Sequence, residues 1–541
     1  MAEQSGAEVL ARAFAEAGVA RIFGVPGGGS SLDLIAAAKR EGIGFVLARH
    51  EFAAGVMASV TAELSGTPGI ALCTRGPGVG NAANAMANAA LERSPLVLVA
   101  DGFAPAERGF ATHQYFDHAA MMAPVAKETV ALDTMPAGMA AHRAIAAALA
   151  APCGATLIEM SAEAARAPAA AMPRFARPMP SVADTAALTA ARSLLGRAKR
   201  PVAILGLELL DPDAALAARA LVAALGCPAL VTYKGKGAVP DADPLFAGIF
   251  TGGAAEAPVL DQADAILLLG ADPVEFIPKP WRWGVPLLDC GTAPRPLHYR
   301  QPDAACYGAL APMLRALAEG LAPSAWTPAE IARFRETWKR VLANPGGGHN
   351  ARGLGPQRVV EITQAACRRA GADPRLAVDA GAHMFPATTY WEASRPGDLL
   401  ISNGLATMGF ALPAGIAAAL HDPARGAMAF IGDGGLLMQL GEVATAATLG
   451  VKLVTVVLND AGLSLIDIKK GARDLPERTL DWPRVDFAAA ARAMGAAGFT
   501  ADSEAGFAAA LAEALALPGP SVIDVAVDPS GYPAQIKALR G

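Results

Sequence analysis

Short apolar runs alternate with alanine-rich segments along the whole chain, and this alternation is the feature that most restricts its fold. Short runs bounded by glycine or proline are typical of buried strands, whereas longer alanine-rich segments are typical of helices. Parallel strands need a crossover connection, which is usually a helix, so strand, helix and strand in succession favour a parallel sheet. We therefore predict an α/β protein built from doubly wound parallel sheets.

The expected strands fall into three groups. Those of the first third are residues 22–25, 44–47, 69–73, 96–100 and 155–159. Those of the middle third are residues 201–205, 229–232 and 265–270. Those of the last third are residues 376–378, 399–402, 427–431, 452–458 and 521–527. Three groups of this kind predict three sheets, each with its own crossover helices.

Two breaks separate the groups. A stretch rich in proline and alanine, residues 164–180, is typical of a linker, and a second break falls at Asn344-Pro345-Gly346-Gly347-Gly348. A chain of 541 residues is also too long for a single core. We expect domains over residues 1–170, 185–325 and 350–541.

Composition excludes several classes of protein. The chain is 53% apolar and 18% charged with a formal net charge of −5, and it has no basic run, so it offers no electrostatic basis for binding nucleic acid. No uninterrupted apolar segment is long enough to span a membrane, and the N-terminus does not resemble a signal peptide. Six scattered cysteines without metal or redox spacing favour a reducing cytoplasm. We therefore expect a cytoplasmic globular protein that binds neither nucleic acid nor a membrane.

Two aspartates follow neighbouring strands of the last group. Asp433 lies in Gly432-Asp433-Gly434, which we expect to form a turn after strand 427–431, and Asp460 follows strand 452–458. A helix is expected between them, over residues 436–448. The carboxyl ends of parallel strands meet at one edge of a sheet, where α/β proteins bind ligands. Two carboxylates there suit magnesium, and the adjacent glycines let a phosphate approach the backbone.

At these residues the chain resembles the thiamine diphosphate (ThDP) enzymes, in the branch of acetolactate synthase, pyruvate oxidase and benzaldehyde lyase. The resemblance covers nearly the whole chain and implies a pyrimidine-binding domain, a middle Rossmann-like domain and a diphosphate-binding domain. It also implies that Asp433, Asp460 and the carbonyl of Gly462 bind Mg²⁺. Asp460 stands where asparagine is usual in the family, and we expect its carboxylate still to bind the metal.

The resemblance assigns further residues to ThDP. Glu51, in Arg49-His50-Glu51, matches the glutamate that bonds the pyrimidine ring and promotes its reactive tautomer; without the family pattern it would be only an acid at a helix start. Met408 matches the apolar residue that holds ThDP bent, although it is equally suited to core packing. The carbonyl of Ala406 would receive the aminopyrimidine, and His383 would donate to the diphosphate unless it is an ordinary surface histidine. The full set of residues expected to bind ThDP is Pro26, Gly27, Glu51, Gly381, His383, Ala406, Met408, Gly432, Gly434, Gly435, Leu463 and Ile466.

Substrate residues are expected in the first domain. Gln114 matches a glutamine that faces the reacting carbonyl, and we assign it a catalytic role beside Glu51; a polar loop residue is the alternative. Gly28, Arg75 and His113 complete the expected substrate pocket. Arg75 either binds the carboxylate of an acceptor or braces its loop.

The resemblance implies decarboxylation of a 2-oxo acid, or cleavage of a dione or acyloin, followed by transfer of the acyl anion to a second carbonyl. His113 is the only histidine expected near the intermediate, and it has Gln114 beside it instead of a second histidine. Carboligation is favoured because an intermediate without an efficient proton donor should persist long enough to attack a second carbonyl. Simple decarboxylation and a catalytically silent ThDP-binding subunit are the alternatives, and a nicotinamide dehydrogenase is disfavoured because no complete glycine fingerprint is present. For the same reason FAD, which many relatives carry, is allowed but not predicted. In relatives the active site lies between subunits, so a homodimer or homotetramer is expected.

Overall fold

The computed structural model describes residues 4–170, 173–178, 180–295, 299–343 and 353–540. The expected break at 344–348 lies outside the described residues, as do residues 171, 172 and 179 of the expected linker. The chain forms two compact units. Unit 1 comprises Met1–Met179, Leu412–Pro423 and Gln439–Val451, and unit 2 comprises Pro180–Ala411, Ala424–Met438 and Lys452–Gly541.

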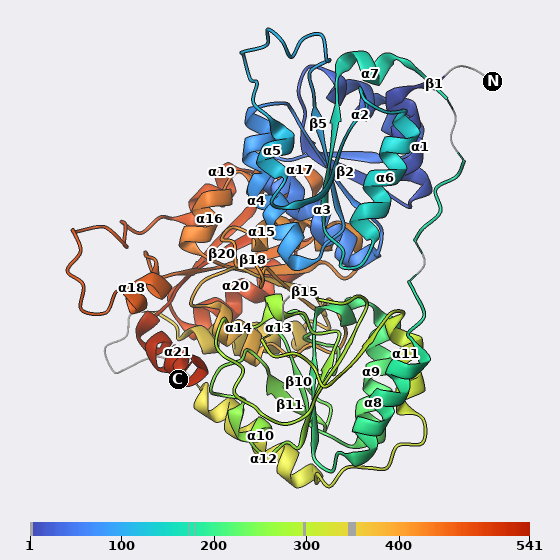
Figure 1. The fold of residues 1–541 in the computed structure, drawn as a ribbon. Coiled ribbons are helices and arrows are strands. Elements are labelled where there is room, and N and C mark those ends of the chain that lie inside the picture. The colour runs from blue at the N-terminus through green and yellow to red at the C-terminus, as the bar shows by residue number, and fades with distance from the viewer. Residues whose placement is uncertain (1–3, 171–172, 179, 296–298, 344–352, 541) are drawn as a thin grey trace. The chain divides into compact units, whose positions relative to one another are not determined.

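Unit 1 contains a six-stranded parallel sheet in the order β3-β2-β4-β5-β7-β6. Its strands are β2 (Arg21–Val25), β3 (Gly44–Leu47), β4 (Gly69–Cys73), β5 (Leu96–Asp101), β6 (Ala126–Ala131) and β7 (Ala155–Met160). Its helices are α1 (Gly6–Glu16), α2 (Ser30–Arg40), α3 (Glu51–Ser65), α4 (Pro77–Glu92), α5 (His118–Met122), α6 (Ala137–Leu149), α7 (Ala162–Arg166), α15 (Ala411–His421) and α17 (Glu442–Leu449). Helices α1, α2 and α6 cover one face of the sheet, and α3 and α4 cover the other (Figure 1). A short antiparallel pair, β1 (Gln4–Ser5) with β8 (Pro168–Ala169), joins the two ends of this region.

Unit 2 contains two further sheets. The middle sheet has the order β11-β10-β9-β12-β13-β14, and all its pairings are parallel. Its strands are β9 (Pro201–Leu205), β10 (Ala229–Val231), β11 (Phe246–Ile249), β12 (Ala265–Leu269), β13 (Leu287–Gly291) and β14 (Ala304–Tyr307). Its helices are α8 (Thr185–Arg197), η1 (Leu207–Leu210), α9 (Pro212–Leu225), α10 (Ala257–Leu260), η2 (Pro273–Glu275), α11 (Leu310–Ala318) and α12 (Pro328–Val341). Counted from its own first strand, this is the 3-2-1-4-5-6 order of dinucleotide-binding folds.

The last sheet has the order β16-β15-β17-β18-β20-β19 and is also parallel. Its strands are β15 (Arg375–Val378), β16 (Leu399–Ile401), β17 (Ala427–Gly432), β18 (Leu453–Asn459), β19 (Ala497–Ala501) and β20 (Ser521–Ala526). Its helices are α13 (Pro356–Arg369), α14 (Met384–Tyr390), α16 (Asp433–Gln439), α18 (Ser464–Lys470), α19 (Phe487–Ala493), α20 (Glu504–Ala516), η3 (Pro529–Gly531) and α21 (Tyr532–Arg540). Counted from their own first strands, the first and last sheets share the order 2-1-3-4-6-5. They are therefore two versions of one topology, although their sequences show no repeat.

The predicted fold class is confirmed, and every expected strand is present to within a few residues. Seven strands were not expected: the short pair β1 and β8, and β6, β11, β13, β14 and β19 of the six-stranded sheets. Of the last five, all but β13 lie at sheet edges, where one side of a strand lacks a partner and a continuous apolar run is not required.

Two local expectations around Asp433 are wrong. Asp433 is the first residue of α16 and not part of a turn, and the single helix expected over 436–448 is broken into α16 and α17. The break falls at Leu440 and Gly441. A Cβ atom on Gly441 would lie 3.3 Å from the Cβ of Arg49, and the next residue, Glu442, bonds the backbone at Arg49. The chain therefore leaves helical geometry where it meets the loop that carries Arg49.

The three sheets are largely buried, as expected for parallel sheets covered by helices on both faces. Every residue of β9, β12 and β18 is buried, for example. Among the described residues, no helix has both the length and the apolar character needed to cross a membrane. The cytoplasmic location stays a prediction.

Candidate cofactor and active site

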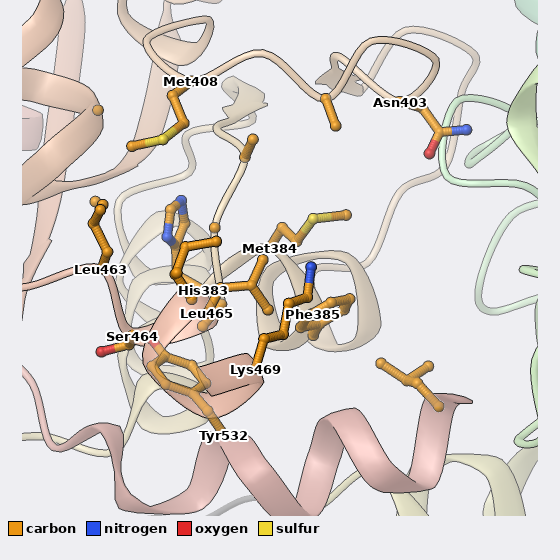
Figure 2. A pocket seen from close by; sticks show the side chains of 18 of the residues that line it. His383, Met384, Phe385, Asn403, Met408, Leu463, Ser464, Leu465, Lys469 and Tyr532 are labelled. Atoms are coloured by element: carbon orange, nitrogen blue, oxygen red, sulfur yellow. The ribbon is translucent and has the colours of Figure 1, made fainter. Parts of the chain in front are cut away.

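A cavity of about 440 Å³ lies in unit 2, where the carboxyl edge of the last sheet meets residues of the middle sheet's loops. Figure 2 shows side chains that line this cavity, among them His383, Met408 and Leu463. Twelve of the residues expected from the sequence lie in its wall. These are Gly381, His383, Ala406, Met408, Gly432, Asp433, Gly434, Gly435, Asp460, Gly462, Leu463 and Ile466.

The two aspartates reach the cavity from adjacent strands. β17 and β18 pair in parallel with Gly432 opposite Leu458, so both strands deliver their aspartate to the same edge. Asp433 is 1% exposed, and its Oδ2 atom is buried without a hydrogen-bond partner. Burial and, to a lesser extent, the negative charge of Asp460 raise the pKa of Asp433 to about 7. Burial also raises the pKa of Asp460, whose carboxylate accepts a hydrogen bond from Ser464.

This pair fits a divalent cation. A buried carboxylate with an unpartnered oxygen is costly unless it is neutralised, and the two acids repel each other. A metal ion between them would remove both costs. The turn after Asp460 offers a third oxygen at Gly462, and it is fixed by the amide of Leu463 donating to the carbonyl of Leu480 over 2.8 Å. Two carboxylates and one carbonyl are hard oxygen ligands of the kind that magnesium prefers.

His383 lies at the glycine-rich side of the cavity. It is 5% exposed, its Nε2 atom has no partner, and burial lowers its pKa to about 4, so the imidazole is neutral at pH 7. A Cβ atom on Gly381 would lie 2.7 Å from the ring, and Gly381 has φ +156°. Glycine is therefore required for the ring to pack here. A neutral imidazole with one unsatisfied nitrogen can donate a hydrogen bond to a phosphate oxygen.

Sequence reasoning missed Asp379, which fixes the segment carrying Met408. Its buried carboxylate accepts hydrogen bonds from the amides of Gly409 (3.0 Å) and Phe410 (3.1 Å). The same carboxylate lies so close to Gly435 that a Cβ atom there would be 2.2 Å from Oδ2. Asp379 thus joins the Met408 segment to the start of α16. The available signal was an acid directly after strand 376–378, the position that Asp433 occupies after its own strand.

Met408 faces the cradle formed by the start of α16. A Cβ atom on Gly434 would lie 3.4 Å from the terminal methyl of Met408, 3.3 Å from Leu463 and 3.1 Å from Trp482. Ala406, two residues earlier, has φ +54°, a left-handed conformation that favours glycine. Alanine at this position therefore carries some backbone strain.

Unit 1 positions Glu51 at the first turn of α3. Glu51 is 8% exposed and accepts a hydrogen bond from Asn81 over 3.0 Å. The preceding amides of Arg49 and His50 both donate to Glu442, over 2.8 and 3.0 Å. Glu442 therefore fixes the backbone that leads into Glu51, a role that its sequence position did not reveal.

Pro26, Gly27 and Gly28 follow β2 in unit 1. A Cβ atom on Gly27 would lie 2.2 Å from Asp101 and 2.4 Å from Thr74, so no other residue fits there. A Cβ atom on Gly28 would meet nothing within 4 Å, which leaves its backbone accessible. The loop thus combines one tightly packed glycine with one open glycine.

The residues expected at the substrate differ in their surroundings. Gln114 and His113 are exposed in unit 1, and Gln114 has φ +56°, which strains a non-glycine residue. Arg75 lies over the ring of Phe103 at 4.2 Å, an arrangement that braces its loop. Next to Arg75, the amide of Gly76 donates to Nε2 of His118 over 3.0 Å. Nδ1 of His118 therefore carries the proton and donates to Glu159 over 2.8 Å.

The carboxyl edge of the middle sheet, where FAD would be sought, is filled by charged side chains. Arg295 contacts Asp289 (3.0 Å) and Glu208 (3.1 Å) and is 3.8 Å from Asp272. Tyr307 donates to Asp289 over 2.8 Å. This edge pairs its own charges, although Nη2 of Arg295 makes no hydrogen bond, and FAD stays unpredicted.

Comparison with known protein families agrees with this architecture. The N-terminal TPP binding domain of thiamine pyrophosphate enzymes matches residues 4–121, the central domain matches 188–317, and the C-terminal TPP binding domain matches 379–525. The chain belongs to the thiamine pyrophosphate enzymes, so thiamine diphosphate is its cofactor class.

Curated relatives place it more closely, among acetolactate-synthase-like enzymes. An acetolactate synthase of Bacillus subtilis is 28% identical over 98% of this chain and 94% of its own length. A catabolic acetolactate synthase of Raoultella terrigena is 29% identical over 97% and 95%. A probable 2-ketoarginine decarboxylase of Pseudomonas aeruginosa is 31% identical over 91% and 88%.

Proposed function

We propose that this protein uses ThDP and Mg²⁺ to decarboxylate a 2-oxo acid, or to cleave a dione or acyloin, and joins the acyl group to a second carbonyl compound. The observation that carries the proposal is the convergence of Asp433, Asp460, His383 and Met408 on one cavity around the start of α16. These four side chains supply a metal pair, a phosphate donor and an apolar support.

Each residue has a defined task. Asp433, Asp460 and the carbonyl of Gly462 would hold Mg²⁺, which neutralises the diphosphate and the two acids. His383 would donate to a phosphate oxygen, and Met408 would support the bent cofactor. When bound, ThDP supplies a carbon nucleophile that adds to the substrate carbonyl. Glu51 would hold a proton at the pyrimidine ring and exchange it during turnover.

Carboligation is favoured over aldehyde release because the cavity wall offers no histidine that could pass a proton to the intermediate near pH 7. Among the described residues that line the cavity, His383 is the only histidine. Its pKa of about 4 means that the ring is neutral near pH 7 and is a poor acid toward the intermediate. The acetolactate synthase relatives point the same way. The name of the Pseudomonas aeruginosa relative favours the alternative, simple decarboxylation, and a catalytically silent ThDP-binding subunit is a further alternative.

Product analysis separates these functions. The purified protein, loaded with ThDP and MgCl₂, is incubated with a panel of 2-oxo acids and diones, and products are identified by mass spectrometry. A 2-hydroxy-3-oxo acid or another ketol supports carboligation, whereas aldehyde alone supports simple decarboxylation. Activity should disappear in EDTA and return with Mg²⁺.

A Glu51→Gln substitution tests whether the chain is a working enzyme. Removing a general acid–base typically costs on the order of 10²–10⁴-fold in rate. We expect kcat to fall by at least about 100-fold, while ThDP binding, followed by tryptophan fluorescence, persists. Unchanged turnover would contradict the assignment of Glu51.

We also propose a homodimer or homotetramer with the active site at a subunit interface. The proposal rests on the family resemblance and on exposed apolar side chains such as Phe110 and Tyr115. Light scattering after size-exclusion chromatography measures the mass, and a monomer with full activity would contradict the proposal.

A further inference from the structure

Two cationic side chains line the cavity in addition to the residues that suit the cofactor. Lys469 comes from α18 and Arg540 from the end of α21. Neither belongs to the metal pair or to the glycine-rich cradle. Their charges therefore need a separate explanation.

The backbone of Arg540 is fixed by the middle domain. The amide of Ala254 donates to the carbonyl of Leu539 over 2.8 Å, and Lys279 donates to the carbonyl of Arg540. Gly253 is packed so closely here that a Cβ atom on it would lie 2.0 Å from the Leu539 carbonyl. The Nε atom of Arg540 is nevertheless buried without a hydrogen-bond partner. An arginine whose backbone is fixed and whose buried Nε atom lacks a partner is suited to binding a ligand.

Lys469 differs from the lysine beside it. Lys470 forms an ion pair with Asp467 over 2.6 Å and does not line the cavity. The Lys469 side chain extends from α18 into the cavity (Figure 2). Within the described part of the chain, its ammonium forms no ion pair. Within α18, Lys470 therefore forms an ion pair on the helix, whereas Lys469 faces the cavity.

Nearby carboxylates do not cancel these charges. Glu256 and Arg540 both influence the pKa of the buried Tyr233, so Glu256 is a nearby acid. Its carboxylate, however, accepts hydrogen bonds from the amides of Thr251 (2.8 Å) and Gly253 (2.9 Å), and Glu256 does not line the cavity. Glu275 lines the cavity, but burial raises its pKa to about 8. The remaining two acids of the wall are Asp433 and Asp460, which fit the metal.

We propose that Arg540 and Lys469 form a subsite for a carboxylate at the far end of the substrate, so that the protein prefers 2-oxo dicarboxylic acids to 2-oxo monocarboxylic acids of equal length. The inference rests on the proposed 2-oxo acid chemistry. Arg540 contributes more than Lys469, because its guanidinium is less exposed and can bind a carboxylate through two hydrogen bonds. A substrate with a cationic tail is disfavoured by like charge.

Steady-state kinetics tests the preference with 2-oxoglutarate and 2-oxovalerate, which differ only in the second carboxylate. We expect kcat/KM to be at least about tenfold higher for 2-oxoglutarate, as hydrogen bonds between charged groups allow. Arg540→Gln should abolish most of this preference, Lys469→Gln should reduce it, and Arg540→Lys should restore part of it. The control substitutions Lys470→Gln and Lys537→Gln, on the same two helices but outside the cavity wall, should leave it unchanged. A 2-oxo acid with a guanidinium tail should have a lower kcat/KM than 2-oxovalerate in the wild type. This difference in kcat/KM should become smaller in the Arg540→Gln protein.

A binding measurement keeps this inference separate from the proposed reaction. Glutarate and pentanoate, which have equal length and cannot react, are titrated calorimetrically into the wild-type and Arg540→Gln proteins. Tighter binding of glutarate to the wild type alone supports the subsite even if no 2-oxo acid turns over, in which case only the proposed function fails. Equal effects of Arg540→Gln on dicarboxylates and monocarboxylates, in both kinetics and binding, would overturn the subsite while leaving the proposed function intact.

Discussion

The carboxyl edges of the two sheets of unit 2 differ in how their buried charged and polar side chains are paired. At the edge of the middle sheet, Arg295 lies among Asp289, Glu208 and Asp272, so opposite charges are paired there, although Nη2 of Arg295 makes no hydrogen bond. At the edge of the last sheet, Asp433 and His383 each keep a buried polar atom without a partner. Both edges are where parallel sheets of this kind bind ligands.

The difference shows which edge is a site and which is a structural core. A buried polar group that lacks an opposite charge costs free energy, and a bound ligand can offset that cost. Charges that are already paired need no ligand for this, but they make the edge dependent on every member of the network. The comparison therefore predicts that changes at the middle edge lower stability, whereas changes at the last edge lower cofactor binding.

The largest effect is expected for Arg295→Met. This substitution leaves several carboxylates buried without their cation, and breaking a buried ion pair in this way typically costs about 3–5 kcal/mol. Chemical denaturation should show a corresponding drop in the free energy of unfolding. The folded fraction should still bind ThDP. A protein of unchanged stability would remove the contrast between the two edges.

Asp433→Asn should weaken ThDP binding without lowering stability, in contrast to Arg295→Met. The substitution removes one of the two carboxylates proposed to bind Mg²⁺, and we expect ThDP affinity in the presence of Mg²⁺ to fall by about 100-fold, equivalent to about 2.7 kcal/mol. The unliganded protein should not lose stability, because a buried carboxylate under repulsion from Asp460 is gone. Calorimetric titration and denaturation of the same variant measure both quantities. Loss of stability with normal ThDP binding would break the comparison.

The pH dependence of stability sharpens the role of His383. Its pKa is lowered by burial to about 4, so between pH 6.5 and 4 the unfolded state binds a proton that the folded state does not. Stability is therefore present above pH 6.5 and is lost as the pH falls. From pH 7 to pH 5 this residue should account for a loss of about 2 kcal/mol. Denaturation at both pH values should show a smaller loss in His383→Gln than in the wild type; identical slopes would contradict the buried neutral ring.

The smallest effect is expected for Asp379→Asn. The amide keeps one oxygen acceptor but cannot accept from all three amides that now bond the carboxylate, so about 1 kcal/mol of support is lost. We expect a several-fold weaker affinity for ThDP and a slightly lower kcat, with the mass of the assembly unchanged. Fluorescence titration measures the first quantity. An unaltered affinity would show that the Met408 segment does not need this anchor.

Much of the fold was predictable because buried parallel strands are short, apolar and bounded by glycine. Four of the six strands at the edges of the six-stranded sheets were missed; β6, for example, reads Ala-Lys-Glu-Thr-Val-Ala and lacks an apolar run. The cradle around Asp433 was predictable from its strand and glycines. Asp379 and Glu442 were not, because their importance lies in backbone amides that only the folded chain brings to them. Arg540 was equally hidden, since nothing in its sequence surroundings marks it as part of a cavity.

The bond between Glu442 and the backbone before Glu51 has a consequence for biosynthesis. Its partners at Arg49 and Glu442 are 393 residues apart in sequence, and unit 1 takes Gln439–Val451 from the last third of the chain. At a synthesis rate of about 5–20 residues per second, the Glu51 loop waits roughly 20–80 s for its acceptor. A ribosome that stalls before Glu442 therefore leaves a nascent chain in which the first sheet is complete but the Glu51 loop lacks its anchor.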